Sequence, residues 1–180
     1  MKNKKALWRK LKSKVGFTLT ELLLTTLILL MVSSVVAVGV PTAANAYFKV
    51  IDAANAQILL STTVTKLKNE LSLANFVSGG GNSIVYNTNG IKKTISKNNN
   101  EGIMVQVEDG DAQQLVPKAI TNSLRSNNMV SEYTSINSKS TPHDQYKDIE
   151  FIITGLKITK DNRTIAGPVN LTIRTVTVIQ

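Results

Sequence analysis

The hydrophobic and polar positions divide the 180-residue chain into stretches of different character. Residues 17–40 contain one charged residue, Glu21, and the others are apolar or uncharged. A helix of that length reaches about 36 Å, which is more than the hydrocarbon thickness of a bilayer, about 30 Å. The stretch therefore predicts a membrane-spanning helix, and Pro41 just beyond it predicts a kink.

After Pro41 the pattern becomes that of an amphipathic helix, which we expect to continue the first one over residues 41–77. Its apolar positions recur at steps of three and four residues, with a slip in phase at residues 61–63. The glycine-rich segment 78–83 is expected to end the helix and act as a linker. The predicted core face consists of Tyr47, Ile51, Ala54, Ile58, Val64, Leu67, Leu71 and Ala74.

Residues 83–180 alternate between apolar and polar positions in short runs, which predicts a β-rich globular domain. Thr88-Asn89-Gly90 is typical of a hairpin turn, and a bulge is expected near residues 174–175, where the apolar positions change from odd to even. A long helix followed by strands predicts an α+β fold, with an antiparallel sheet packed on the outer half of the helix. Strands are expected at 83–87, 90–96, 103–107, 149–153, 156–158 and 169–180, a short helix at 117–125, and loops at 96–100, 126–128 and 135–142.

The net charge of +9 comes mainly from the first sixteen residues, which hold seven of the 21 basic residues and no acidic one. The remaining chain has 14 basic and 12 acidic residues, a small excess that argues against a strongly basic nucleic-acid-binding domain. Positive charge on one side of the apolar stretch predicts that residues 1–16 are cytoplasmic and that the domain lies outside the cell membrane.

The sequence offers no set of residues for catalysis, and we predict no catalytic residue, no metal site and no cofactor. The chain has no cysteine, and its one histidine, His143, lies in a polar stretch. The acidic residues 108–111 lack the ligand spacing of a calcium loop and indicate a polar hairpin turn. The glycosylation patterns at Asn162 and Asn170 require nothing more than chance.

The segment Gly16–Glu21, G-F-T-L-T-E, follows a lysine-rich leader and opens the long apolar helix. In this context it resembles the type IV prepilin cleavage and methylation motif. The resemblance implies that a prepilin peptidase cuts between Gly16 and Phe17 and methylates the new amino group of Phe17. It also implies that Glu21, which is costly in lipid, pairs with the Phe17 amine of a neighbouring subunit. Thr20 departs from the family, which more often has an aliphatic residue there.

The resemblance implies a structural role in a type IV pilus or in the pseudopilus of a type II secretion or competence system. Residues 56–76 resemble those of minor pilins and pseudopilins. The expected partners are other pilin subunits, the prepilin peptidase and the pilus assembly platform in the membrane. The subunit would wait as a single-pass membrane protein, cytoplasmic at its N-terminus, before it joins the fibre.

Two alternatives remain open. The domain could bind a ligand on a pilin scaffold, as in adhesion or DNA uptake; the cluster of Lys92, Lys93 and Lys97 is the candidate nucleic-acid surface. The chain could also be an ordinary anchored or secreted protein, because Ala44-Asn45-Ala46 fits a signal-peptidase site with cleavage after Ala46. The length of the apolar run and the charge of Glu21 argue against a signal peptide.

Overall fold

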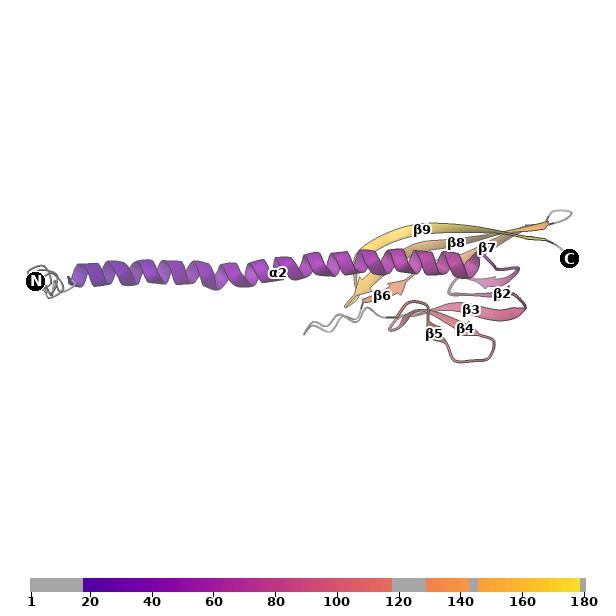
Figure 1. Ribbon diagram of the computed structural model, residues 1–180, viewed down its shortest axis with the longest axis horizontal. Coiled ribbons are helices and arrows are strands. Elements are labelled where there is room, and N and C mark those ends of the chain that lie inside the picture. Colours follow the sequence, from indigo (N-terminus) through magenta and orange to yellow (C-terminus); the bar gives the residue numbers. More distant parts are fainter. Residues whose placement is uncertain (1–17, 118–128, 143–145, 179–180) are drawn as a thin grey trace, which may run out of the picture. The chain divides into compact units, whose positions relative to one another are not determined.

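The computed structural model describes residues 18–117, 129–142 and 146–178. The chain divides into two compact units, Met1–Phe48 and Lys49–Gln180. One helix, α2 (Leu19–Leu71, 53 residues), contributes to both units, and the strands among the described residues belong to the second (Figure 1). The fold is therefore α+β, as predicted, with a long apolar N-terminal helix packed against antiparallel sheets.

The first sheet, called sheet A, is an antiparallel meander of five strands in sequence order. The hairpin between its second and third strands is confirmed. Asn89 (φ 54°) and Gly90 (φ 82°) both take left-handed conformations, as a two-residue turn of this kind requires. The strands are β1 (Phe76–Gly80), β2 (Ser83–Thr88), β3 (Ile91–Asn98), β4 (Gly102–Val107) and β5 (Gln113–Gln114).

The second sheet, called sheet B, is built around the long strand β8 (Tyr146–Lys160). On one edge, β8 pairs with β6 (Met129–Glu132) and then with β7 (Ser135–Pro142); on the other edge it pairs with β9 (Arg163–Val178). Two backbone hydrogen bonds between Gly81 and Ile136 join sheet A to sheet B.

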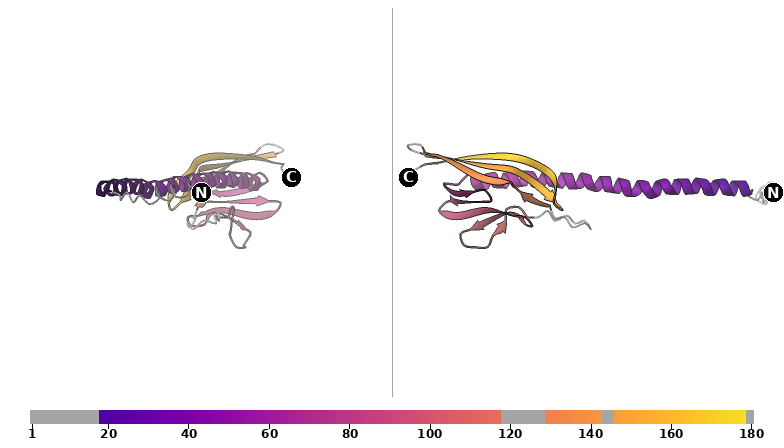
Figure 2. Two further views of the ribbon diagram at one scale, coloured as in Figure 1. Left: turned by 60° about the vertical axis from the view of Figure 1, so that its left-hand side comes forward. Right: turned by 180° about the vertical axis from the view of Figure 1, so that it is seen from behind.

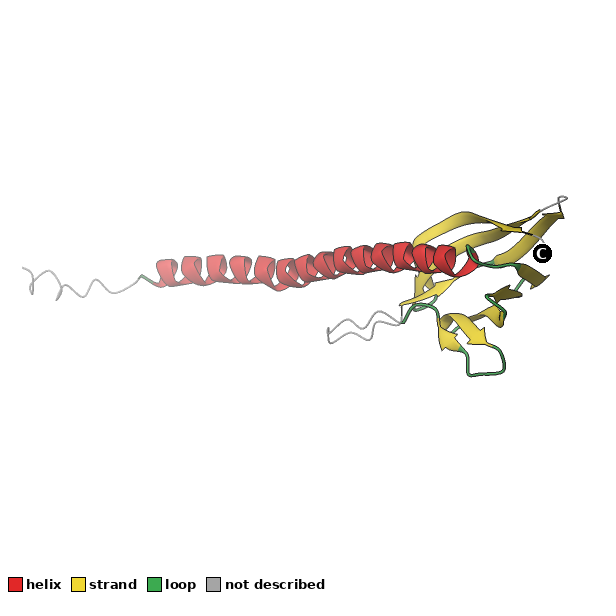
Figure 3. Cartoon of the chain, turned by 45° about the vertical axis from the view of Figure 1, so that its right-hand side comes forward, coloured by secondary structure: helices red, strands yellow, loops and turns green. Residues whose placement is uncertain are grey.

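Within the second unit, the C-terminal part of α2 lies between the two sheets (Figures 1 and 3), an arrangement also visible from behind in Figure 2. Two clusters of buried residues hold it there. The larger cluster joins Leu67, Leu71 and Ala74 to both sheets, through residues such as Ile84, Tyr86, Ile95, Phe151 and Ile153. The smaller cluster consists of Ala56, Leu59, Met129, Ile158 and Ala166.

The predicted core face of the helix is confirmed in its second half and wrong in its first half. Tyr47 and Ile58 are each 64% exposed, whereas the buried positions in this region are Ala56, Leu59 and Thr63. These continue the step of three and four residues, so no slip in phase occurs at residues 61–63. The Thr63 hydroxyl donates to the Leu59 carbonyl (2.7 Å), which allows a polar residue to be fully buried.

The predicted end of the helix, at residue 77, is also wrong. The helix ends at Leu71, and Phe76–Gly80 forms β1 instead of a glycine linker. The Asn75 N–H donates to the Asn87 carbonyl (2.9 Å), so pairing with β2 begins before β1 itself. The backbone N–H and C=O groups of this segment therefore pair with β2, as they would have paired within a longer helix. Gly79 has a φ of 91°, which a glycine adopts easily and which a helix does not contain.

The strand predictions from β7 onward need three corrections. Residues 135–142, expected to be a loop, form β7, and the two strands expected on either side of Gly155 form one strand, β8. No register shift occurs near residues 174–175; the shifts lie between Ile153 and Thr159. Thr175 is buried like Ile173, so the odd-numbered positions of β9 still face the core there. The Thr175 hydroxyl donates to the Ala74 carbonyl (3.5 Å). Residues 118–128 of the expected helix and loop lie outside the described residues.

Candidate functional site

The candidate site lies at the start of α2, where Glu21 occupies the first turn of the helix. Gly16 and Phe17, the predicted cleavage and methylation residues, lie outside the described residues. The Glu21 carboxylate accepts hydrogen bonds from the Thr18 N–H (3.0 Å) and the Thr18 hydroxyl (2.9 Å). The Glu21 N–H in turn donates to the Thr18 hydroxyl oxygen (3.3 Å).

This reciprocal arrangement is a capping box, in which Thr18 caps the helix and Glu21 reaches back to the capping residue. It satisfies backbone donors that the first turn leaves free, and it places a carboxylate at the positive end of the helix dipole. Glu21 therefore has a hydrogen-bonding partner within its own helix, which the sequence analysis did not consider. The signal was present in the sequence, since Thr18-Leu19-Thr20-Glu21 matches the T-x-x-E pattern of such a cap.

The helix that follows presents an apolar surface of membrane-spanning length. Every residue from Thr18 to Val50 is exposed, and the helix is long and apolar enough to cross a membrane. The helix continues without a break through Pro41, where a kink was expected. Because proline lacks an N–H, the Ala37 carbonyl loses its helical donor there. The neighbouring Val38 carbonyl accepts an additional bond from the Thr42 hydroxyl (2.7 Å).

Four hydroxyl groups of this apolar segment bond to the helix backbone. Each donates to a backbone carbonyl three or four residues earlier, at distances of 2.7–3.0 Å; the residues are Thr25, Thr26, Ser34 and Thr42. An unpaired hydroxyl would be costly in a hydrocarbon environment, whereas an internally bonded one is tolerated. The surface is therefore suited to contact with lipid or with another apolar helix.

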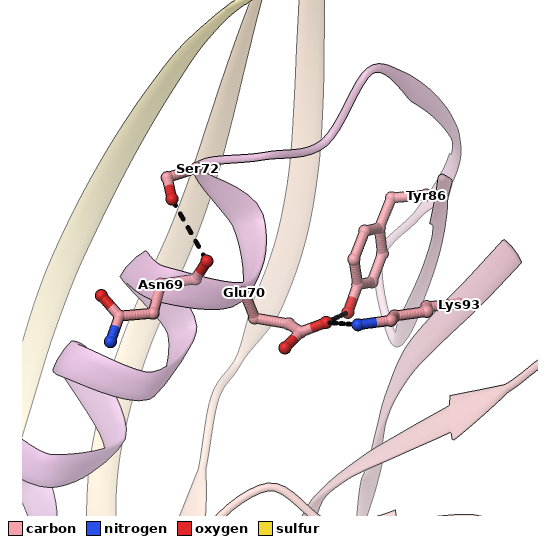
Figure 4. A network of polar contacts seen from close by, with 5 residues as sticks. All are labelled: Asn69, Glu70, Ser72, Tyr86 and Lys93. Carbon is pink, nitrogen blue, oxygen red and sulfur yellow. Dashed lines mark hydrogen bonds and ion pairs between the residues drawn. The ribbon is translucent and has the colours of Figure 1, made fainter. Parts of the chain in front are cut away.

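Two ion pairs attach α2 to the sheets in the second unit. Lys160 of sheet B donates to Asp52 (2.7 Å), and the Lys160 side chain is only 11% exposed. At the other end of the packed segment, the Glu70 carboxylate accepts bonds from the Tyr86 hydroxyl (2.9 Å) and the Lys93 ammonium (2.5 Å), both from sheet A (Figure 4). Burial, with the negative charge of Glu70 and its hydrogen bond, raises the pKa of Tyr86.

The lysines proposed for nucleic-acid binding do not form one surface. Lys93 and Lys97 share the face of β3 that carries the buried Ile95, whereas Lys92 is exposed on the opposite face. Lys93 is paired with Glu70, and the Lys97 ammonium donates to the Tyr133 carbonyl (3.5 Å). Two of the three charges are therefore directed into the domain, which weakens the DNA-uptake alternative.

The other candidate residues are distributed over separate parts of the chain. Residues 108–111 form part of the connection between β4 and β5, with the Gly110 N–H donating to the Val107 carbonyl (3.0 Å). Asn162 is exposed in the β8–β9 turn, and the Asn170 side chain accepts the Gly155 N–H (2.9 Å). Among the described residues, no three histidine, cysteine or acidic side chains gather as a metal site. His143 lies outside them.

A shallow polar hollow of about 280 Å³ lies between the β3–β4 and β8–β9 turns. Its lining includes two carboxylates, those of Glu132 and Asp161. Glu132 already accepts a bond from the Thr159 hydroxyl (3.1 Å) and lies 3.9 Å from the Lys157 ammonium. The hollow therefore offers no concentrated charge with which to hold an ion.

Comparison of the chain with protein families, with curated proteins and with solved structures found no match. Any proposal for the function therefore depends on the residues of the candidate site and on the geometry of α2.

Proposed function

We propose that the chain is a structural subunit of a type IV pilus or pseudopilus, processed after Gly16 and assembled through α2. The observation that carries this proposal is the exposed apolar surface of α2 that begins with the carboxylate of Glu21. Soluble monomers rarely expose a contiguous apolar surface of this extent. Lipid would cover it before assembly, and the helices of neighbouring subunits would cover it in the fibre.

The capping box supplies the starting state of this proposed pathway. Before processing, Thr18 holds the Glu21 carboxylate against the first turn of the helix. Cleavage would create an ammonium group on Phe17, and a neighbouring subunit could present its own ammonium to Glu21. In a water-poor environment, an ion pair between the carboxylate and an ammonium group is stronger than the hydrogen bonds that the carboxylate accepts from the uncharged donors of Thr18. Assembly would then exchange a local partner for a stronger one in another chain.

The finer assignment, to a minor pilin or pseudopilin of a secretion or competence system, is part of the same proposal. The partners would be other pilin subunits, the prepilin peptidase and the assembly platform in the membrane. The leader would remain cytoplasmic, because its positive charges resist transfer, and the second unit would lie outside. The proposed role is structural and requires neither catalysis nor a cofactor.

Cleavage after Ala46 fits the structure less well. Ala44-Asn45-Ala46 lies inside the continuous helix α2, whereas proteases prefer segments that are exposed and unfolded. Such a cut would leave both core clusters intact, because every member lies beyond residue 48. A secreted domain beginning at Tyr47 therefore remains a defined outcome that an experiment can recognise.

The decisive experiment determines the N-terminus and intact mass of the protein purified from its native cell. We expect a chain that begins at Phe17 and is one methylene unit heavier than the unmodified sequence. A chain that begins at Tyr47 would establish a secreted domain, and one that retains Met1 would establish a simple anchor; either result would overturn the proposal.

A second experiment tests assembly through the charge of Glu21. Glu21→Gln keeps the size and cap geometry of the side chain but removes its charge, so we expect a processed subunit that stays in the membrane and is lost from sheared fibres. Glu101→Gln, in an exposed turn of the second unit, is the matched control and should leave the fibre fraction unchanged. Equal recovery of both variants in fibres would contradict the proposed pairing.

A further inference from the structure

Two adjacent aromatic residues, Tyr47 and Phe48, follow the apolar surface of α2. Tyr47 is 64% exposed and Phe48 is 38% exposed, and their rings lie 6.0 Å apart at an angle of 59°. The residues between them and Val40 carry no charge, and the next charged residue along the sequence is Lys49. Tyrosine has an apolar ring with a polar tip, which suits the boundary between lipid and water.

The length of the helix places this pair near such a boundary. Tyr47 lies 26 residues after Glu21 in one continuous helix, which corresponds to about 39 Å. Side chains in a helix lean toward its N-terminus, so the ring of Tyr47 covers the preceding turn, about 5 Å closer to Glu21. A bilayer has a hydrocarbon core of about 30 Å within a total thickness of about 40–45 Å. With Glu21 at the inner boundary, the ring falls among the outer headgroups.

We infer that Tyr47 and Phe48 form an interfacial anchor, which binds the headgroup region of the outer leaflet and sets the depth of α2 in the membrane. The capping box would mark the inner boundary, and the aromatic pair the outer one. The inference rests on the membrane-resident state in the proposed function. It goes beyond that function by naming the residues that fix the position of the subunit before assembly.

Tryptophan fluorescence in lipid vesicles tests this directly with the full-length chain. Trp8 is the only tryptophan, so Trp8→Phe gives a silent background. Single tryptophans are then placed by Tyr47→Trp, by Leu30→Trp in the middle of the apolar stretch, and by Ile58→Trp, whose native side chain is 64% exposed in the second unit. Each variant is measured in vesicles of phosphatidylcholine brominated either near the headgroup or near the ends of the acyl chains.

We expect Leu30→Trp to be quenched most by the deep bromines, Tyr47→Trp most by the shallow ones, and Ile58→Trp by neither. If Tyr47→Trp behaves like Ile58→Trp while Leu30→Trp is quenched by the deep bromines, the anchor is wrong and the membrane span stands. If Leu30→Trp is quenched by neither lipid, the membrane span itself falls, and the anchor falls with it.

A second measurement tests whether Tyr47 and Phe48 set the depth of α2 in the membrane or only lie at the interface. In the Leu30→Trp protein, the double change Tyr47→Ala and Phe48→Ala should alter the ratio of deep to shallow quenching by about twofold, because the helix can slide once its outer anchor is removed. Ile58→Ala is the matched control and should leave the ratio unchanged. An unchanged ratio in the double variant would overturn the depth-setting role.

Discussion

Alkaline pH should destabilise the second unit, because Tyr86 and Tyr133 are buried with their hydroxyl groups hydrogen-bonded. The Tyr86 hydroxyl donates to Glu70 (2.9 Å), and the Tyr133 hydroxyl donates to the Asn82 carbonyl (2.7 Å). Burial raises the pKa of Tyr86, to which Glu70 contributes, and burial also raises the pKa of Tyr133. The folded protein therefore keeps both protons after the unfolded chain has lost them.

The sign and size of the effect follow from proton linkage. In unfolded chains tyrosine has a pKa of about 10, so above that pH the unfolded state binds fewer protons than the folded state, and the free energy of unfolding decreases. At about pH 11 the loss is about 1.4 kcal/mol for each tyrosine that stays protonated in the fold, or about 3 kcal/mol for both. Domains of this kind have only about 5–15 kcal/mol of stability, so the effect is measurable.

The assay is urea unfolding of the detergent-solubilised chain at a series of pH values from about 8 to 11, followed by tertiary circular dichroism. Tyr86→Phe should lower stability at neutral pH by about 1.5–3 kcal/mol, since it removes a hydrogen bond to a carboxylate. It should nevertheless reduce the loss between about pH 9 and 11 by about 1.4 kcal/mol, and Tyr133→Phe should do the same. If the double variant lost as much stability over this interval as the native chain, the reasoning would be refuted.

Two further changes test the packing of the second unit. Leu67→Ala should lower the free energy of unfolding by about 2–5 kcal/mol, because Leu67 is fully buried in the larger core cluster. Ile58→Ala, on the exposed face of the same helix, should change it by less than about 0.5 kcal/mol, and similar losses in the two variants would contradict the observed helix face. Gly155→Ala should lower the free energy of unfolding by more than about 1 kcal/mol in the same assay. The reason is that Gly155 has a φ of 65° and that a Cβ there would collide with the Thr134 side chain. Unchanged stability would contradict this backbone geometry.

The sequence predicted those parts of the fold that depend on local chemistry. The apolar helix follows from its composition, and the hairpin at Asn89-Gly90 follows from the residues that a left-handed turn accepts. The buried face at the end of the helix, with Leu67 and Leu71, was correctly predicted because large apolar side chains recur there at helical spacing.

The errors arose where tertiary contacts decide the outcome. Ala56 is buried against residues of sheet B, whereas the predicted Ala54 is exposed, and only the contact with the sheet decides between these two alanines. The polar segment 135–142 becomes a strand because it pairs with β8, and its own residues carry no strand pattern. Thr175 occupies a core position through a hydrogen bond to Ala74, a residue distant in sequence, so its polarity suggested a bulge that does not exist.

At the candidate site, the sequence identified Glu21 as the unusual residue and missed its local partner. The T-x-x-E pattern from Thr18 to Glu21 predicts this cap, whereas the resemblance to a prepilin motif implies a partner in another chain. The helix cap and the proposed pairing use the same carboxylate at different stages. Thr18 belongs to the candidate site for this reason, together with Glu21.

The distribution of the smaller core cluster has a consequence for the order in which the protein can be made. Ala56 and Leu59 are synthesised well before Ile158 and Ala166, which belong to the same cluster and lie on β8 and β9. Until β8 and β9 have been synthesised, this part of the helix lacks their cover, so the smaller cluster can form only after β9 has left the ribosome. A chain truncated before β9 would expose this face beside an already apolar helix, and cellular quality control could recognise it as unfinished.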